Sequence, residues 1–155
     1  MPEPLFESGG KLLLFSDGGA RGNPGPAAIG YVVGSKKYGE RIGYATNNVA
    51  EYKAVIAALQ KAKQLLGKTK AKQTELEVRM DSELVCKQMH GKYKILEPEL
   101  QKLFIEVWNL KQEFKSVTFI HIPREQNKDA DRMVNEALDG PDKEHNPARA
   151  GLWDR

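Results

Sequence analysis

The sequence predicts an α/β fold: one mixed β-sheet with helices packed on its faces. Strand-like segments come first, and two of them are joined by a link short enough for an antiparallel hairpin. A long amphipathic segment then shows the helical spacing of apolar residues. After it, strand and helix patterns alternate, which is typical of parallel strands connected by helices. The expected order of elements is β β β α β α α β α.

The first part of the chain predicts three strands. Residues 11–16 are apolar on both alternating faces, as in a central strand that is covered on both sides. A loop rich in glycine and proline is expected to follow over residues 18–26. Residues 27–34 and 37–45 are joined by a Gly-Ser link, so they are expected to form an antiparallel hairpin.

The second part predicts helices that alternate with strands. A long helix is expected from Asn48, because apolar residues recur at i, i+3, i+4 and i+7. Residues 74–80 alternate between apolar and charged side chains, as in a strand with one buried face. Ser82 and Asn127 are the expected N-caps of later helices. The elements expected in this part cover residues 48–66, 74–80, 82–89, 98–114, 117–122 and 127–138.

Composition indicates a single globular domain. The chain has 155 residues, of which 40% are hydrophobic, and a net charge of +3, so we expect one domain over residues 11–138. Tails are expected over residues 1–10 and 139–155. No apolar run is long enough to predict a membrane span, and the N-terminus lacks the layout of a secretion signal. The lone Cys86 is expected to be a buried thiol in a reducing compartment, which favours the cytoplasm.

Four acidic residues, Asp17, Glu51, Asp81 and Asp131, stand where a strand ends or a helix begins. Each has a structural interpretation: a turn for Asp17, and a favourable charge or cap at a helix N-terminus for the other three. If the fold gathers them, their mutual repulsion requires a cation, and hard oxygen ligands favour Mg²⁺ or Mn²⁺. The four acids therefore predict metal-assisted phosphodiester chemistry.

The motifs around these acids resemble those of the ribonuclease H family, type 1. The resemblance spans residues 11–138 and implies a five-stranded mixed sheet, three antiparallel strands then two parallel, with helices on both faces. A short loop and the lack of a basic protrusion resemble the archaeal-type branch. The matching segments are Asp17-Gly-Gly-Ala-Arg-Gly-Asn-Pro-Gly-Pro26, Thr46-Asn47-Asn48 to Glu51, Asp81-Ser82 and Asn127-x-x-x-Asp131.

The resemblance implies an endoribonuclease that hydrolyses the RNA strand of RNA–DNA hybrids and leaves 5′-phosphate and 3′-hydroxyl ends. It implies that Asp17, Glu51, Asp81 and Asp131 hold two Mg²⁺ ions during catalysis, with Mn²⁺ as a substitute. Arg124 lies in the short loop where many members carry a catalytic histidine, so it is the expected replacement.

The expected partner is a hybrid duplex, and activity on double-stranded RNA is left open by the resemblance. No membrane partner is expected, and the protein is expected to be a monomer. For the asparagines, turn and cap roles are the structural alternative. The residues expected to contact substrate are Gly18, Gly19, Ala20, Asn23, Thr46, Asn47, Asn48 and Ser82.

Two positions depart from the family pattern. Glu83 stands where glutamine is common and would repel phosphate unless it is neutralised. His121 falls within a strand and is expected to pack beside Phe119 rather than act in catalysis.

Other functions remain open at this point. A duplex-binding module of the same fold with weak catalysis is one alternative, but the intact set of four acids disfavours it. A ribonuclease H segment of a reverse-transcriptase polyprotein is disfavoured by the start at Met1. An exonuclease of the wider superfamily is disfavoured by the glycine loop.

Overall fold

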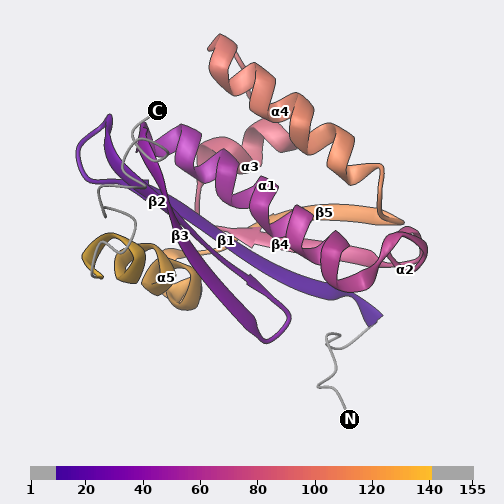
Figure 1. Cartoon of the computed structure of the whole chain (residues 1–155). Helices are drawn as coiled ribbons and strands as arrows, with labels where there is room; N and C mark the ends of the chain where they lie inside the picture. The colour runs from indigo at the N-terminus through magenta and orange to yellow at the C-terminus, as the bar shows by residue number, and fades with distance from the viewer. Residues whose placement is uncertain (1–9, 141–155) are drawn as a thin grey trace, which may run out of the picture.

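A computed structural model describes residues 10–140, in which five strands form one mixed sheet in the order β3-β2-β1-β4-β5 (Figure 1). The pairs β1–β2 and β2–β3 are antiparallel, whereas β1–β4 and β4–β5 are parallel. This is the predicted architecture. The strands are β1 (Leu12–Ala20), β2 (Gly25–Val33), β3 (Lys36–Ala45), β4 (Glu75–Met80) and β5 (Ser116–His121).

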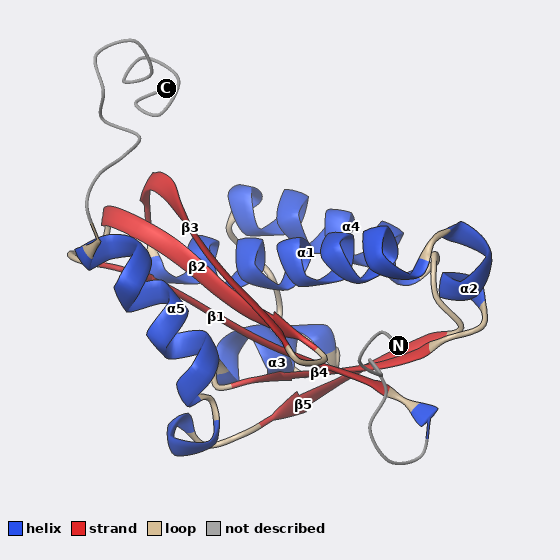
Figure 2. Ribbon diagram, turned by 60° about the horizontal axis from the view of Figure 1, so that its bottom comes forward, coloured by secondary structure: helices blue, strands red, loops and turns tan. Residues whose placement is uncertain are grey.

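The helices cover both faces of the sheet, and most of them share one face. Helices α1, α3 and α4 lie together on one side, and α5 crosses β1, β2 and β3 on the other (Figure 2). In the described residues no helix is long and apolar enough to cross a membrane. The helices are α1 (Asn47–Leu66), α2 (Lys68–Lys72), α3 (Glu83–Met89), α4 (Pro98–Lys111), the 3₁₀ turn η2 (Arg124–Gln126) and α5 (Lys128–Asp139).

The core lies between the sheet and α1. Burial in β4 alternates as the sequence predicts, with Leu76, Val78 and Met80 facing inward. Strand β2 is buried on both faces because α1 and α5 cover it from opposite sides. Inside the core, the hydroxyl of Tyr52 donates to Oε1 of Gln88 at 2.6 Å and joins α1 to α3.

The glycine-rich segment differs from its prediction as a loop. Residues 18–20 continue β1, because they pair with 27–29 of β2. Only residues 21–24 connect the two strands, and the Asn23–Pro24 peptide bond is cis. Gly18 permits a close approach between backbones, whereas Gly22, with a φ of +94°, lies in the turn.

Three smaller differences concern helices. The short α2 is absent from the predicted order, because five residues are too few to show a helical period. Phe114 lies beyond the end of α4 at Lys111, although it is buried as expected. Asn127 precedes α5, but its side chain forms no cap hydrogen bond. Most of the two predicted tails, residues 1–9 and 141–155, lies outside the described residues.

Candidate metal centre

The sheet brings Asp17 and Asp81 together. Strands β1 and β4 are parallel neighbours whose pairing ends with Ser16 opposite Met80, so the next residues, Asp17 and Asp81, lie side by side where the two strands part. Sites in such sheets form at the carboxyl ends of the strands. Asp81 directly follows β4, as predicted, whereas Asp17 lies inside β1 rather than at its end, because β1 continues through residues 18–20 in its pairing with β2.

Glu51 reaches the site because α1 packs tightly on β1 at Gly18. A Cβ at Gly18 would lie 2.2 Å from the carbonyl carbon of Ala50 and 2.6 Å from the main-chain N of Glu51. The N–H of Gly18 donates to Oε1 of Glu51 at 2.8 Å. This hydrogen bond fixes the carboxylate against the strand.

Asp131 approaches from the opposite face of the sheet, on the first turn of α5. Helix α5 lies close to β2 because Gly30 has no side chain: a Cβ there would lie 2.2 Å from the carbonyl oxygen of Ala130. The four predicted acids therefore come from four separate parts of the chain: β1, α1, the residue after β4, and α5.

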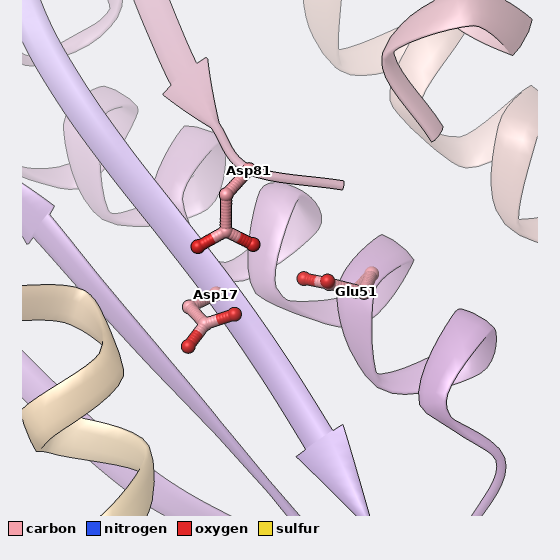
Figure 3. Close-up of side chains that lie close together, drawn as sticks. All are labelled: Asp17, Glu51 and Asp81. Carbon is pink, nitrogen blue, oxygen red and sulfur yellow. The ribbon is translucent and has the colours of Figure 1, made fainter. Parts of the chain in front are cut away.

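Three of these acids form a compact group. Asp17, Glu51 and Asp81 each offer an oxygen, and the three oxygens lie within 4.8 Å of one another (Figure 3). Asp131 is outside this group, but it lines the same cleft of about 300 Å³, and its negative charge helps to raise the pKa of Asp17. The predicted convergence of the four acids is therefore observed, with three at the centre and one beside them.

The electrostatics of the group favour a cation. Burial, then the charges of Asp81 and Asp131, raise the pKa of Asp17 to about 8. Burial and the charge of Asp17 raise the pKa of Glu51 well above its usual range, although the Gly18 N–H and the Arg124 guanidinium oppose that rise. Hard carboxylate oxygens crowded in this way match the ligand preference of a divalent cation such as Mg²⁺ or Mn²⁺.

The sequence of this chain is similar to those of known proteins that include a ribonuclease. A family model described as reverse transcriptase-like matches residues 15–137. Ribonuclease HI of Halobacterium salinarum is 40% identical over 139 residues, covering 86% of this chain and 67% of that protein. A bifunctional protein of Mycobacterium tuberculosis is 41% identical over 136 residues, which cover 83% of this chain but 36% of that protein. The chain thus spans about a third of the length of its mycobacterial relatives.

Solved structures of RNase H1 proteins have a similar fold. The crystal structure of LC11-RNase H1 in complex with an RNA/DNA hybrid matches with a TM-score of 0.78 and 46% identity, over 83% of this chain and 97% of that one. RNase H1 from Halobacterium salinarum matches with a TM-score of 0.78 and 39% identity, over 85% of this chain and 100% of that one. The chain belongs to the ribonuclease H family, type 1. The family resemblance and the fold predicted from the sequence are confirmed.

The ribonuclease H cleft contains half of the residues expected to contact substrate. Gly18, Gly19, Ala20 and Asn47 line it, together with Arg124. The guanidinium of Arg124 is close enough to the acids to lower the pKa values of Asp17 and Glu51 against the effect of burial. The role expected for Arg124 in catalysis stays a prediction.

Asn23, Thr46, Asn48 and Ser82 lie outside the described lining of the cleft. The side chain of Thr46 caps α1 by accepting from the N–H of Val49 at 3.2 Å. Ser82 caps α3 through the N–H of Val85 at 3.2 Å, as predicted.

The asparagines of the glycine segment and of α1 hold the tip of the β1–β2 hairpin against the start of α1. Oδ1 of Asn23 accepts from the N–H of Asn47 at 2.9 Å. Oδ1 of Asn47 in turn accepts from the N–H of Ala20 at 2.9 Å. The side chains of Asn23 and Asn47 therefore have a structural role in joining these two segments. Their contact with substrate stays a prediction.

Sequence reasoning missed one wall of the cleft. Val134, Asn135 and Leu138 line it together with Asp131, at the spacing of one helical stripe. This helical spacing from Asp131 could have identified the other three residues from the sequence. Arg21 also lines the cleft; it pairs with Asp139 near the end of α5 and donates to Oδ1 of Asn135 at 3.4 Å.

The two departures from the family pattern have local explanations. Glu83 forms an ion pair with Lys87 at 3.1 Å, one turn along α3, which offsets its charge. His121 is exposed at the end of β5. The histidine close to Phe119 is His90, whose Nε2 lies 2.7 Å from the Phe119 carbonyl oxygen.

The raised pKa of Asp17 predicts that the metal-free protein loses stability as pH rises. The folded state favours the protonated carboxyl, so its stabilising effect is complete below the ordinary value of 3.8 and is lost as pH approaches about 8. At about 1.4 kcal/mol per pKa unit, we expect a loss of a few kcal/mol between pH 5 and pH 8. Thermal unfolding in EDTA across this range measures it, and saturating Mn²⁺ should restore the lost stability.

Asp17→Asn is the control for this pH dependence, because it removes the titrating group while keeping its shape. The stability of this variant in EDTA should change less with pH than that of the wild type. Parallel profiles for the two proteins would contradict the prediction.

Proposed function

We propose that this protein is an endoribonuclease that hydrolyses the RNA strand of RNA–DNA hybrids and leaves 5′-phosphate and 3′-hydroxyl ends. The observation that carries the proposal is the group of carboxylate oxygens from Asp17, Glu51 and Asp81 within 4.8 Å of one another. The matched ribonuclease HI and the RNA/DNA-bound RNase H1 structure support the choice of substrate.

The proposed cofactor is a pair of Mg²⁺ ions, with Mn²⁺ as a substitute, held by Asp17, Glu51, Asp81 and Asp131. Divalent ions bound there would supply activation of the attacking water and neutralisation of charge on the departing 3′-oxygen. Asp17 interacts electrostatically with each of the other three acids, so binding of divalent ions would depend on it most. Glu51, which is held by the Gly18 N–H, would supply a ligand of restricted orientation.

The proposed substrate surface runs along the glycine edge of the cleft. A hybrid duplex presents a shallow minor groove with 2′-hydroxyl groups. At Gly19, a Cβ would meet only Cγ1 of Val134, at 3.7 Å, which is an ordinary contact. The fold leaves room for a side chain there, so we infer that the glycine serves to let the RNA backbone approach closely.

The cleavage assay that tests the proposal uses matched RNA–DNA, RNA–RNA and DNA–DNA duplexes with Mg²⁺, Mn²⁺ or EDTA. We expect cleavage of the RNA strand of the hybrid, none of the DNA duplex, and none in EDTA. Cutting of end-blocked hybrids distinguishes an endonuclease from an exonuclease. No cleavage in either metal would contradict the proposal and favour a duplex-binding module.

We also propose that the enzyme acts as a monomer in the cytoplasm. The buried and free Cys86 supports a reducing compartment. Cutting of the RNA–RNA duplex in the same assay would extend the substrate range to double-stranded RNA.

Arg124→Ala is expected to slow turnover more than it weakens binding. The guanidinium lowers the pKa of Asp17 and lines the cleft, which supports a role in stabilising charge on the departing phosphate. We expect kcat to fall about tenfold, which corresponds to about 1.4 kcal/mol of barrier, and KM to change less than about threefold.

Arg132→Ala is the matched control. Arg132 lies on α5, is exposed, and is outside the described cleft lining. It pairs with Asp129 and Glu136. Steady-state kinetics of the two variants should differ. An unchanged kcat in Arg124→Ala would remove its proposed role.

A further inference from the structure

We propose that Asn127 is a positioning residue that holds Asp81 and the end of β1 in the arrangement needed to bind a divalent cation. The inference deepens the proposed nuclease function and rests on it. Asn127 is only 1% exposed. Its Nδ2 donates to the main-chain oxygen of Ser16 at 2.9 Å and to Oδ2 of Asp81 at 3.1 Å. Since Ser16 directly precedes Asp17, one amide group joins the two segments that carry these acids.

The main chain of Asn127 connects two more groups of the site. Its N–H donates to the carbonyl oxygen of Arg124 at 2.9 Å and closes η2. Its carbonyl oxygen accepts from the N–H of Asp131 at 3.1 Å and closes the first turn of α5. The side chain is therefore anchored on the sheet, while the main chain sets the positions of Arg124 and Asp131.

The orientation of the Asn127 side chain argues against a capping role. An asparagine just before a helix ordinarily accepts a hydrogen bond from an N–H of the first turn. Here the side chain forms no cap bond, and Oδ1 is buried without a hydrogen-bond partner in the described structure. Leaving a buried acceptor unpaired costs free energy. The side chain is thus placed to donate to Ser16 and Asp81 rather than to satisfy its own oxygen.

A neutral donor suits a residue that supports a metal ligand. A lysine or arginine in its place would restrain Asp81 but would also offset the negative charge that attracts a cation. The Asn127 amide restrains the carboxylate of Asp81 by a hydrogen bond to a charged acceptor and leaves the charge of the acidic group intact. Groups that orient metal ligands in this way commonly change metal affinity about 10- to 100-fold when they are removed.

The test is binding of Mn²⁺ to the full chain, measured by isothermal titration calorimetry for the wild type and Asn127→Ala. We expect the dissociation constant of the variant to rise about tenfold or more. Hybrid cleavage by the variant should recover as Mn²⁺ is raised, with little change in KM for the hybrid. An unchanged dissociation constant in Asn127→Ala would overturn the inference, whereas absence of binding by the wild type would overturn the proposed function as well.

Val107→Ala is the matched control for lost stability. Val107 is fully buried on α4 and lies outside the acidic site, so truncating it should weaken the fold without changing Mn²⁺ affinity. An equal loss of affinity in Val107→Ala would show that the effect of Asn127→Ala is only structural and would overturn the inference.

A measurement on the wild type keeps the inference testable if Asn127→Ala does not fold. The side-chain amide protons of Asn127 are hydrogen-bonded to Asp81 and Ser16, so their NMR signals should shift when Mg²⁺ saturates the site. Exposed Asn109, on α4, provides the reference amide. No shift at Asn127 under saturating Mg²⁺ would overturn the inference.

Discussion

Replacing Asp17 by Asn is expected to reduce hybrid cleavage at least about 1,000-fold while leaving the fold intact. Asp17 is 7% exposed and interacts with all three of the other acids, so no neighbouring carboxylate can take its place. The amide keeps the shape of the side chain but removes its negative charge, so it would be a much weaker oxygen ligand for a divalent cation. Single-turnover cleavage at saturating Mg²⁺ measures the effect.

The same variant is expected to be more stable than the wild type in EDTA near pH 8. Burial and the neighbouring charges that raise the pKa of Asp17 to about 8 disfavour its ionised form in the fold. A neutral amide avoids this repulsion, so we expect a gain of about 1 to 3 kcal/mol in the free energy of unfolding. Loss of activity together with a gain in stability is a combination that general misfolding cannot produce.

Asp129→Asn is the matched control for Asp17→Asn. Asp129 is an exposed acid on the first turn of α5 that pairs with Lys37 at 3.4 Å and lies outside the cleft. Its removal should leave cleavage within about twofold of the wild type. Near-normal cleavage by Asp17→Asn would refute the assignment of the acids to a metal site.

The parts of the site that could be predicted depend on local pattern and strand direction. The alternation of Leu76, Val78 and Met80 fixes which face of β4 is buried, and a parallel neighbour then places Asp81 beside Asp17. Periodicity also identified α1, which carries Glu51. These inferences use only the periods of strands and helices and the rule that sites form at strand ends.

The parts that could not be predicted depend on contacts between distant residues. Nothing near Asn127 in the sequence indicates that its side chain donates to Ser16, 111 residues away, rather than capping α5. In the same way, residues 18–20 carry a turn-like composition but become strand because β2 pairs with them. Local propensity favours a loop there, and tertiary packing overrides it.

Gly18→Ala is expected to destabilise the protein by about 3 kcal/mol and to disrupt the site. An added Cβ would lie 2.2 Å from the main-chain carbonyl of Ala50. Backbone on both sides of this contact leaves no flexible side chain that could move away, so α1 would have to shift from β1. The shift would lengthen the hydrogen bond from the Gly18 N–H to Glu51, which is 2.8 Å long in the native fold. Urea unfolding and Mn²⁺ titration measure the two effects.

Gly19→Ala is the sharpest control for stability, because it makes the same chemical change one residue along the same strand. The added Cβ at Gly19 would find Val134 at 3.7 Å and no backbone contact, so its free energy of unfolding should stay within about 1 kcal/mol of the wild type. Helix α1 reaches β1 only because residue 18 has no side chain, and this approach is what brings Glu51 to Asp17. If Gly18→Ala and Gly19→Ala were equally stable, the close packing of α1 on β1 would not be the constraint that positions Glu51.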